Sequence, residues 1–129
     1  MNKGIGYEKS RRFALRVVKM HGVLAKRRVP HALSDQILRS GTSVGANLAE
    51  AACAVSRADF LAKVYGALKE CAETKYWISL LADCGALSAE ESKSLFGDCE
   101  ELFKILMATT KTLVSDKTAK ESVKKESVK

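Results

Sequence analysis

Apolar residues recur at intervals of three and four through most of the chain, the spacing that gives a helix one apolar face. Turn signals divide this pattern into four segments, which predict helices at about residues 8–26, 34–55, 57–83 and 88–114. No segment alternates apolar and polar residues with a period of two. We therefore expect an all-α protein, an antiparallel up-down-up-down four-helix bundle with short connections.

Capping and breaking residues support these boundaries. Pro30 cannot lie inside a helix, and Ser34 is a candidate N-cap for the second helix. Gly85 suits the left-handed position that follows a helix. Ser88 and Glu91 have the spacing of a capping box, which predicts the start of the fourth helix.

The segment 115–129 differs from the rest of the chain, because it repeats the string KESVK and has almost no apolar residues. Such a segment has too little apolar surface to pack against a core. We therefore expect one bundle domain over residues 1–114, followed by a mobile lysine-rich tail.

The composition fits a single domain outside the membrane. The chain has 129 residues, of which 47% are hydrophobic, enough for one packed core. It shows neither a signal peptide nor an apolar run of the ~20 residues that span a bilayer. Its four cysteines form no C-x-x-C pair, so we expect small buried thiols in a reducing cytoplasm, with a disulfide as the less favoured alternative.

Positive charge is concentrated at the N-terminus. The net charge is +7, and residues 1–28 hold nine basic residues against the single acid Glu8. Most of the basic residues occupy one sector of the predicted first helix or follow it directly, as expected for a surface that binds a phosphate backbone. The candidate nucleic-acid-binding residues are Lys9, Arg12, Arg16, Lys19, Lys26, Arg27 and Arg28. A solvated helix face and a surface for an acidic protein remain alternatives.

The stretch RSGTSVGANLAEA, residues 39–51, lacks the lysine and the spacing of a phosphate-binding loop. Gly41 and Gly45, four residues apart, instead predict close approach of a neighbouring helix. Polar residues follow a second line on the same helix, which we expect to be partly buried against another helix or another subunit. That line consists of Arg39, Ser43, Asn47 and Glu50.

Candidate catalytic groups do not form a recognisable set. His21 and His31 have no serine or cysteine partner at motif spacing. Glu70 and Glu73 could point into a bundle, but no Glu-x-x-His motif accompanies them. The sequence therefore predicts a protein that is not an enzyme and has neither a metal nor a cofactor.

Two blocks of sequence carry a family resemblance. LSDQILRSGTSVGANLAEA and SRADFLAKVYGALKECAETKYWISLLADCG resemble the four-helix-bundle proteins encoded within intervening sequences of bacterial 23S ribosomal RNA genes. The residues that match the signature of the first block include Gln36, Arg39, Ser43, Asn47 and Glu50. The glycine usual after Ala-Glu is Ala51 here, and the N-terminal helix is more basic than is typical.

The resemblance implies a homopentamer without known catalytic activity. The family is similar to the accessory variability protein of diversity-generating retroelements, which binds nucleic acid and a reverse transcriptase. The family-motif residues are accordingly expected to serve packing or an interface. From these arguments we expect a protein that binds RNA or other nucleic acid through its first helix. The alternatives are a scaffold for an acidic partner such as a reverse transcriptase, and a structural protein with no ligand.

Overall fold

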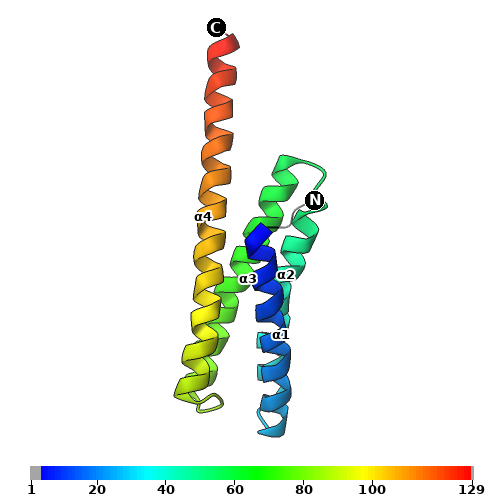
Figure 1. Ribbon diagram of the computed structural model, residues 1–129, viewed down its shortest axis with the longest axis vertical. Coiled ribbons are helices and arrows are strands. Elements are labelled where there is room, and N and C mark those ends of the chain that lie inside the picture. Colours follow the sequence, from blue (N-terminus) through cyan, green and yellow to red (C-terminus); the bar gives the residue numbers. More distant parts are fainter. Residues whose placement is uncertain (1–3, 129) are drawn as a thin grey trace.

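The computed structural model describes residues 4–128, except for the side chains of residue 5 and of residues 117–128. Four helices follow one another: α1 (Gly4–Lys26), α2 (His31–Ala51), α3 (Arg57–Asp83) and α4 (Ala89–Val128). Each helix runs against the direction of the one before it (Figure 1). α2 lies between α1 and α3, and α4 lies beside α3 and α1. The described residues form no strand, as the sequence predicted.

The core lies along the centre of the bundle and takes residues from every helix. Its largest fully buried side chains come from the predicted apolar faces. Residues spaced by three or four positions lie on one side of a helix, and this side faces the core. They include Phe13, Val17 and Leu24 of α1, Ile37 and Val44 of α2, Val64, Ile78 and Leu81 of α3, and Leu95, Leu102 and Leu106 of α4.

The turn between α3 and α4 follows the predicted chemistry. Gly85 has a φ of +80°, and the amide of Ala86 donates to the carbonyl of Leu81, which closes the end of α3. The amide of Glu91 donates to Ser88 Oγ at 3.0 Å, and the amide of Ser88 donates to Glu91 Oε1 at 2.9 Å. The capping box is therefore confirmed.

The start and end of α2 differ from the prediction. α2 begins at His31, directly after Pro30, whose backbone is already extended and introduces the helix. Ser34 is buried inside the first turn and does not cap the helix. α2 ends at Ala51 rather than near residue 55, and Val55 is 93% exposed in the connection to α3.

α1 and α4 are longer than the sequence predicted. α1 begins at Gly4 rather than near residue 8, and α4 continues to Val128 rather than ending near residue 114. Figure 1 shows α4 extending past the ends of the other three helices. Residues 115–128 contain no glycine or proline and are rich in lysine and glutamate, which have a high intrinsic helix propensity. The mobility expected for the tail remains a prediction, because its side chains from residue 117 onward lie outside the described part.

The four cysteines are free thiols. Cys71 and Cys99 are buried between α3 and α4, with their sulfur atoms 3.7 Å apart. The hydrogen bond with Cys71 and burial raise the pKa of the Cys99 thiol, which keeps it protonated. Cys53 and Cys84 are exposed, so the expectation of burial is wrong for these two, which lie at helix ends.

Candidate nucleic-acid interface

The outer face of α1 carries a line of exposed cations, Arg12, Lys19 and Lys26. They are seven residues apart, and because seven residues make nearly two helical turns, their side chains leave the helix in almost the same direction. Among the described residues none of the three has an ion-pair partner. We call these three residues the cation line.

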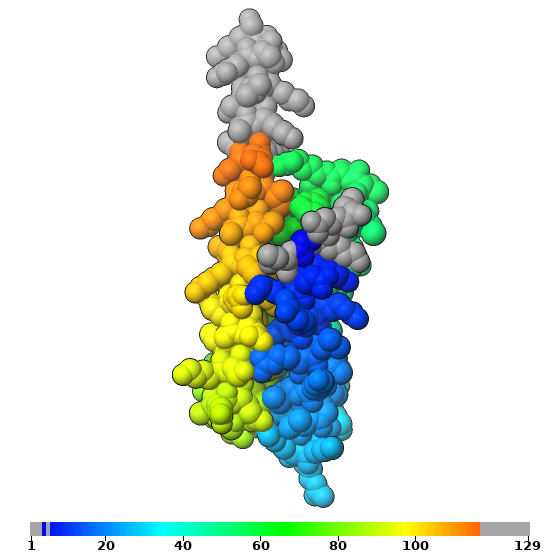
Figure 2. All heavy atoms as spheres, viewed as in Figure 1, coloured from blue at the N-terminus to red at the C-terminus, as the bar shows by residue number. Residues whose placement is uncertain are grey.

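Lys9 and Arg16 point away from this line, toward α4. Lys9 forms an ion pair with Glu101, and Arg16 Nη1 donates to Asp98 Oδ2 at 2.5 Å. Arg16 Nη2 also donates to Ser94 Oγ at 3.0 Å. In Figure 2, α1 and α4 lie side by side over the length of the bundle, which is where these pairs form. The structure thus assigns both residues a contact inside the bundle that the sequence did not predict.

Arg27 holds the C-terminal end of α1 against the turn between α3 and α4. Both of its terminal nitrogens donate to the carboxylate of Glu91 at 2.8 Å, and Nη1 also donates to the carbonyl of Ala86. The hydrogen bonds from Arg27, and then that from the Ser88 amide, lower the pKa of Glu91 to about 2. The same contact with Glu91 raises the pKa of Arg27.

Arg28 ends α1 in a left-handed conformation, with a φ of 61°. The amide of Val29 donates to the carbonyl of Leu24, the same closure that Gly85 permits after α3. The side chain of Arg28 is exposed and has no ion pair among the described residues. It continues the positive surface beyond Lys26.

The seven candidate residues therefore fall into two groups. Lys9, Arg16 and Arg27 are ion-paired with α4, whereas the cation line and Arg28 are free to meet a ligand. Sequence reasoning missed Arg11, which is exposed and unpaired within the described part of the chain. It also missed the carboxylates of α4, although Glu91, Asp98 and Glu101 recur on one helix face at intervals of seven and three.

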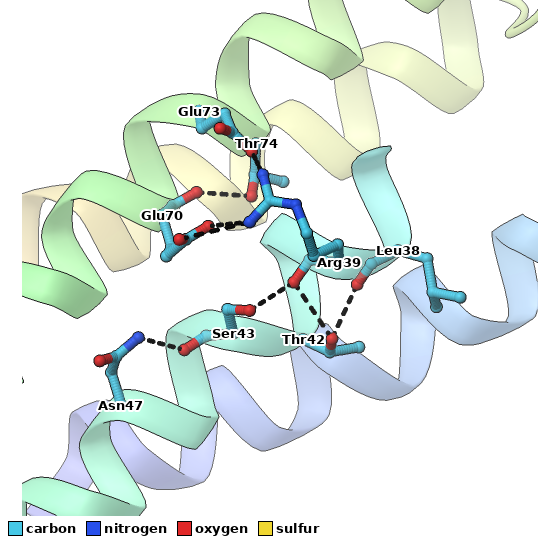
Figure 3. Close-up of polar contacts among 8 residues, drawn as sticks. All are labelled: Leu38, Arg39, Thr42, Ser43, Asn47, Glu70, Glu73 and Thr74. Atoms are coloured by element: carbon cyan, nitrogen blue, oxygen red, sulfur yellow. Dashed lines mark hydrogen bonds and ion pairs between the residues drawn. The ribbon is translucent and has the colours of Figure 1, made fainter. Parts of the chain in front are cut away.

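The polar line of α2 faces α3, as Figure 3 shows. Arg39 donates to Glu70 Oε2 at 3.1 Å and also pairs with Glu73. At the other end of the line, Lys63 Nζ lies 3.3 Å from Glu50 Oε2. The line lies against α3 of the same chain, where Ser43 and Asn47 are partly buried as expected, whereas Arg39 and Glu50 are exposed. Gln36, one turn before Arg39, is half-buried, and no hydrogen bond of its side chain is found within the described residues.

Asn47 and Ser43 bond within α2. Ser43 Oγ donates to the carbonyl of Arg39, and Asn47 Nδ2 donates to the carbonyl of Ser43 at 2.9 Å. Asn47 Oδ1 lies against Gly66 of α3, where a β-carbon would come within 2.7 Å of it. Gly66 thus leaves room for the side-chain amide of Asn47. The sequence pattern of α2 or of α3 alone does not predict this contact.

Gly41 and Gly45 face α1, so the predicted close helix contact is present. A β-carbon on Gly41 would lie 2.9 Å from both methyl groups of Val17. One on Gly45 would lie 3.1 Å from Ser10 Oγ. The backbones of α1 and α2 approach closely because these two side chains are missing.

The titratable groups of residues 6–116, whose side chains are described, do not gather into a catalytic arrangement. His21 Nε2 is 2.8 Å from Asp35 Oδ1 in a pair at the surface, and no nucleophile accompanies it in the described residues. Within the same residues, no three histidine, cysteine or carboxylate side chains lie close enough to hold a metal ion. None of the described helices combines the length and the apolar character needed to cross a bilayer.

Comparison with known proteins places this geometry in a family. No curated protein matches the sequence. A solved structure of a protein with unknown function from the S23 ribosomal protein family of Bacteroides thetaiotaomicron VPI-5482 is 42% identical. The similarity covers 83% of this chain and 99% of the other, with a TM-score of 0.81. The family described as 23S rRNA-intervening sequence protein matches residues 3–108, which include α1, α2, α3 and the first half of α4. The chain belongs to the 23S rRNA-intervening sequence protein family.

Proposed function

We propose that the protein is a non-enzymatic helical bundle that binds RNA or other nucleic acid through the outer face of α1. The observation that carries this proposal is the cation line, whose three side chains are exposed and have no carboxylate partner in the described part of the chain. Arg28 continues this surface beyond Lys26, and Arg11 adds an exposed cation on the side of α1 toward α2. Unpaired cations can exchange their counterions for phosphates without first breaking a contact inside the protein.

A salt titration combined with mutation tests this proposal. The Arg12→Ala, Lys19→Ala, Lys26→Ala triple variant should bind RNA more weakly, with the slope of log affinity against log salt reduced by about 2–3, or roughly 0.7–0.9 per lost phosphate contact. The matched control replaces Lys69, Lys93 and Lys111, three exposed lysines of α3 and α4, with alanine. The control removes equal charge elsewhere and should retain most of the slope. No binding by the native protein at low salt would contradict the proposal.

The same proposal includes assembly into a homopentamer, supported by membership of the family and by the resemblance on which that expectation rested. Five copies would present five cation lines to one nucleic acid and would raise the apparent affinity by multivalency. Light scattering of the purified protein measures the mass directly. A monomer at micromolar concentration would contradict this part of the proposal without affecting the binding of nucleic acid.

A second candidate function is a scaffold for an acidic protein partner such as a reverse transcriptase. The observation that favours it is the exposure of Leu15 and Val18, which are 52% and 51% exposed beside the cations. Apolar side chains that reach solvent next to charges are common in protein interfaces. A pulldown whose captured protein survives nuclease treatment would favour this function over nucleic-acid binding.

A further inference from the structure

The solvent side of α1 is divided into three parallel strips. The cation line occupies the middle. Helical geometry places Leu15, Gly22 and Val18 on the side of that line toward α2, at rotations of about 40–120° from it. The other side borders α4 and its carboxylates. The surface therefore changes from largely apolar to cationic to ion-paired within about one helix width.

The apolar strip is open to solvent. Leu15 and Val18 each expose about half of their surface, although core-facing neighbours such as Val17 are fully buried. A β-carbon on Gly22 would meet no atom within 4 Å, so nothing in the described bundle covers this part of the strip. Arg11 lies at the same rotation as these residues and is also exposed.

The ion-paired border is formed by Glu91, Asp98 and Glu101 of α4 together with the α1 cations Lys9, Arg16 and Arg27. Each carboxylate pairs with a cation of α1, yet the side chains of Asp98 and Glu101 remain 47% and 53% exposed. A cleft of about 430 Å³, lined in part by Arg12 and Arg16, runs between the two helices here. A phosphate on this side of the cation line meets cations that are already paired with carboxylates, so it gains less attraction there than on the cation line itself.

We infer that this surface binds single-stranded rather than double-stranded RNA, an inference that rests on the proposed function. A single strand has phosphates along one edge and unpaired bases along the other, so its phosphates can follow the cation line while its bases contact Leu15 and Val18. A duplex keeps its bases paired inside and presents two phosphate backbones, one of which would lie over the border with α4, where carboxylates already occupy the cations of α1. The chemistry of the three strips therefore favours the single strand over the duplex.

Fluorescence anisotropy with two RNA probes tests the inference. The probes are an unstructured strand of about 15 nucleotides and a duplex of the same length, both at about 0.15 M salt. The single strand should bind about tenfold more tightly. Equal affinity, or tighter binding of the duplex, overturns the inference but leaves the proposed function intact. No binding of either probe removes the proposed function itself.

Two sets of variants test whether the apolar strip and the border with α4 cause the preference for single-stranded RNA. Leu15→Ala with Val18→Ala should weaken single-strand binding about threefold to tenfold with an unchanged salt slope, and should leave duplex binding unchanged. Asp98→Asn with Glu101→Gln should raise the affinity for the duplex more than that for the single strand. Val55→Ala is the apolar control, since Val55 is highly exposed in the connection between α2 and α3.

Circular dichroism shows whether each variant is folded, and light scattering reports its mass. A change of mass in the Leu15→Ala, Val18→Ala variant would show that the apolar strip contacts a second copy of the chain, which overturns the inference. The inference is also overturned if Leu15→Ala with Val18→Ala weakens the binding of the single strand and of the duplex equally.

Discussion

α1 contacts its two neighbours in opposite ways. Against α2 it packs backbone to backbone, because Gly41 and Gly45 have no side chains to separate the helices. Against α4 it is held by ion pairs whose members remain about 27–53% exposed. A close-packed contact tolerates no added volume, whereas exposed charges exchange water and salt freely. We therefore expect the contact between α1 and α2 to contribute more to stability. The charges between α1 and α4 can be substituted at little cost in stability.

The largest effect is expected from Gly41→Ala. The added β-carbon would come within 2.9 Å of the methyl groups of Val17, so one helix must move. We expect a net loss of about 1–3 kcal/mol in the free energy of unfolding, despite a gain of about 1 kcal/mol in helix propensity. Urea denaturation measures the loss. Gly22→Ala on α1 is the control and should stabilise the protein by about 1 kcal/mol, because its β-carbon meets nothing.

A double variant sharpens this expectation. In the presence of Val17→Ala the methyl groups that Gly41→Ala would strike are gone. The second substitution should then cost little or should stabilise, so the two effects are not additive. Additive effects would show that the close approach of α1 and α2 does not depend on this pair.

The contact between α2 and α3 gives an intermediate case at Gly66. Gly66→Ala places a β-carbon 2.7 Å from Asn47 Oδ1 and should cost about 1 kcal/mol, because Asn47 must give up its hydrogen bond to Ser43. In an Asn47→Ala background the same change should stabilise by about 0.5–1 kcal/mol through helix propensity. Thermal and urea unfolding of the four proteins measure this reversal of sign. A penalty in both backgrounds would point to another contact.

On the side of α1 that faces α4, stability should depend on pH rather than on the volume of the side chains. The pKa of Glu91 is about 2 in the folded protein, below its ordinary value of 4.5, so its contribution to stability is complete above about pH 5 and is lost as the pH falls toward 2. Glu91→Gln removes that contribution. Urea denaturation across this range should show the difference between the native protein and the variant shrinking as the pH falls. A difference that stays constant would contradict the role of the Arg27 contact.

The smallest effect is expected from Arg16→Gln. Both Arg16 and Asp98 are more than one third exposed, and exposed ion pairs contribute little. We expect the free energy of unfolding to change by about 0.5 kcal/mol or less, and to change even less at high salt. A loss above about 1 kcal/mol would mean that α4 packs against α1 more firmly than the exposure of this pair indicates.

The same contrast explains how much the sequence could predict. Helix number, the core faces, the capping box at Ser88 and the glycine contact follow from spacing within one helix, and the structure contains them. Ser34 was wrong as a cap because α2 begins three residues earlier, at His31, with Pro30 in the N-cap position. The seven basic residues looked equivalent in sequence, because nothing within α1 shows that Lys9 and Arg16 reach α4.

Relations between helices remained hidden for the same reason. Asn47 and Gly66 are 19 positions apart and become neighbours only through the register of α2 against α3. The register depends on the turn after Ala51, which the periodicity placed near residue 55. An error of a few residues at one turn is enough to move every pair across that interface.

The order of the helices also sets how the chain should fold. Three of the four helix–helix contacts join helices that are neighbours in sequence. The contact between α1 and α4 instead brings the two ends of the bundle together, and it is the least extensive of the four. It therefore offers the least packing to offset the entropy lost on closing so long a loop. Local contacts of this kind favour rapid folding, in which α2 and α3 pair early. The ion pairs of α4 should then form after the transition state, so their removal should speed unfolding and leave the folding rate almost unchanged.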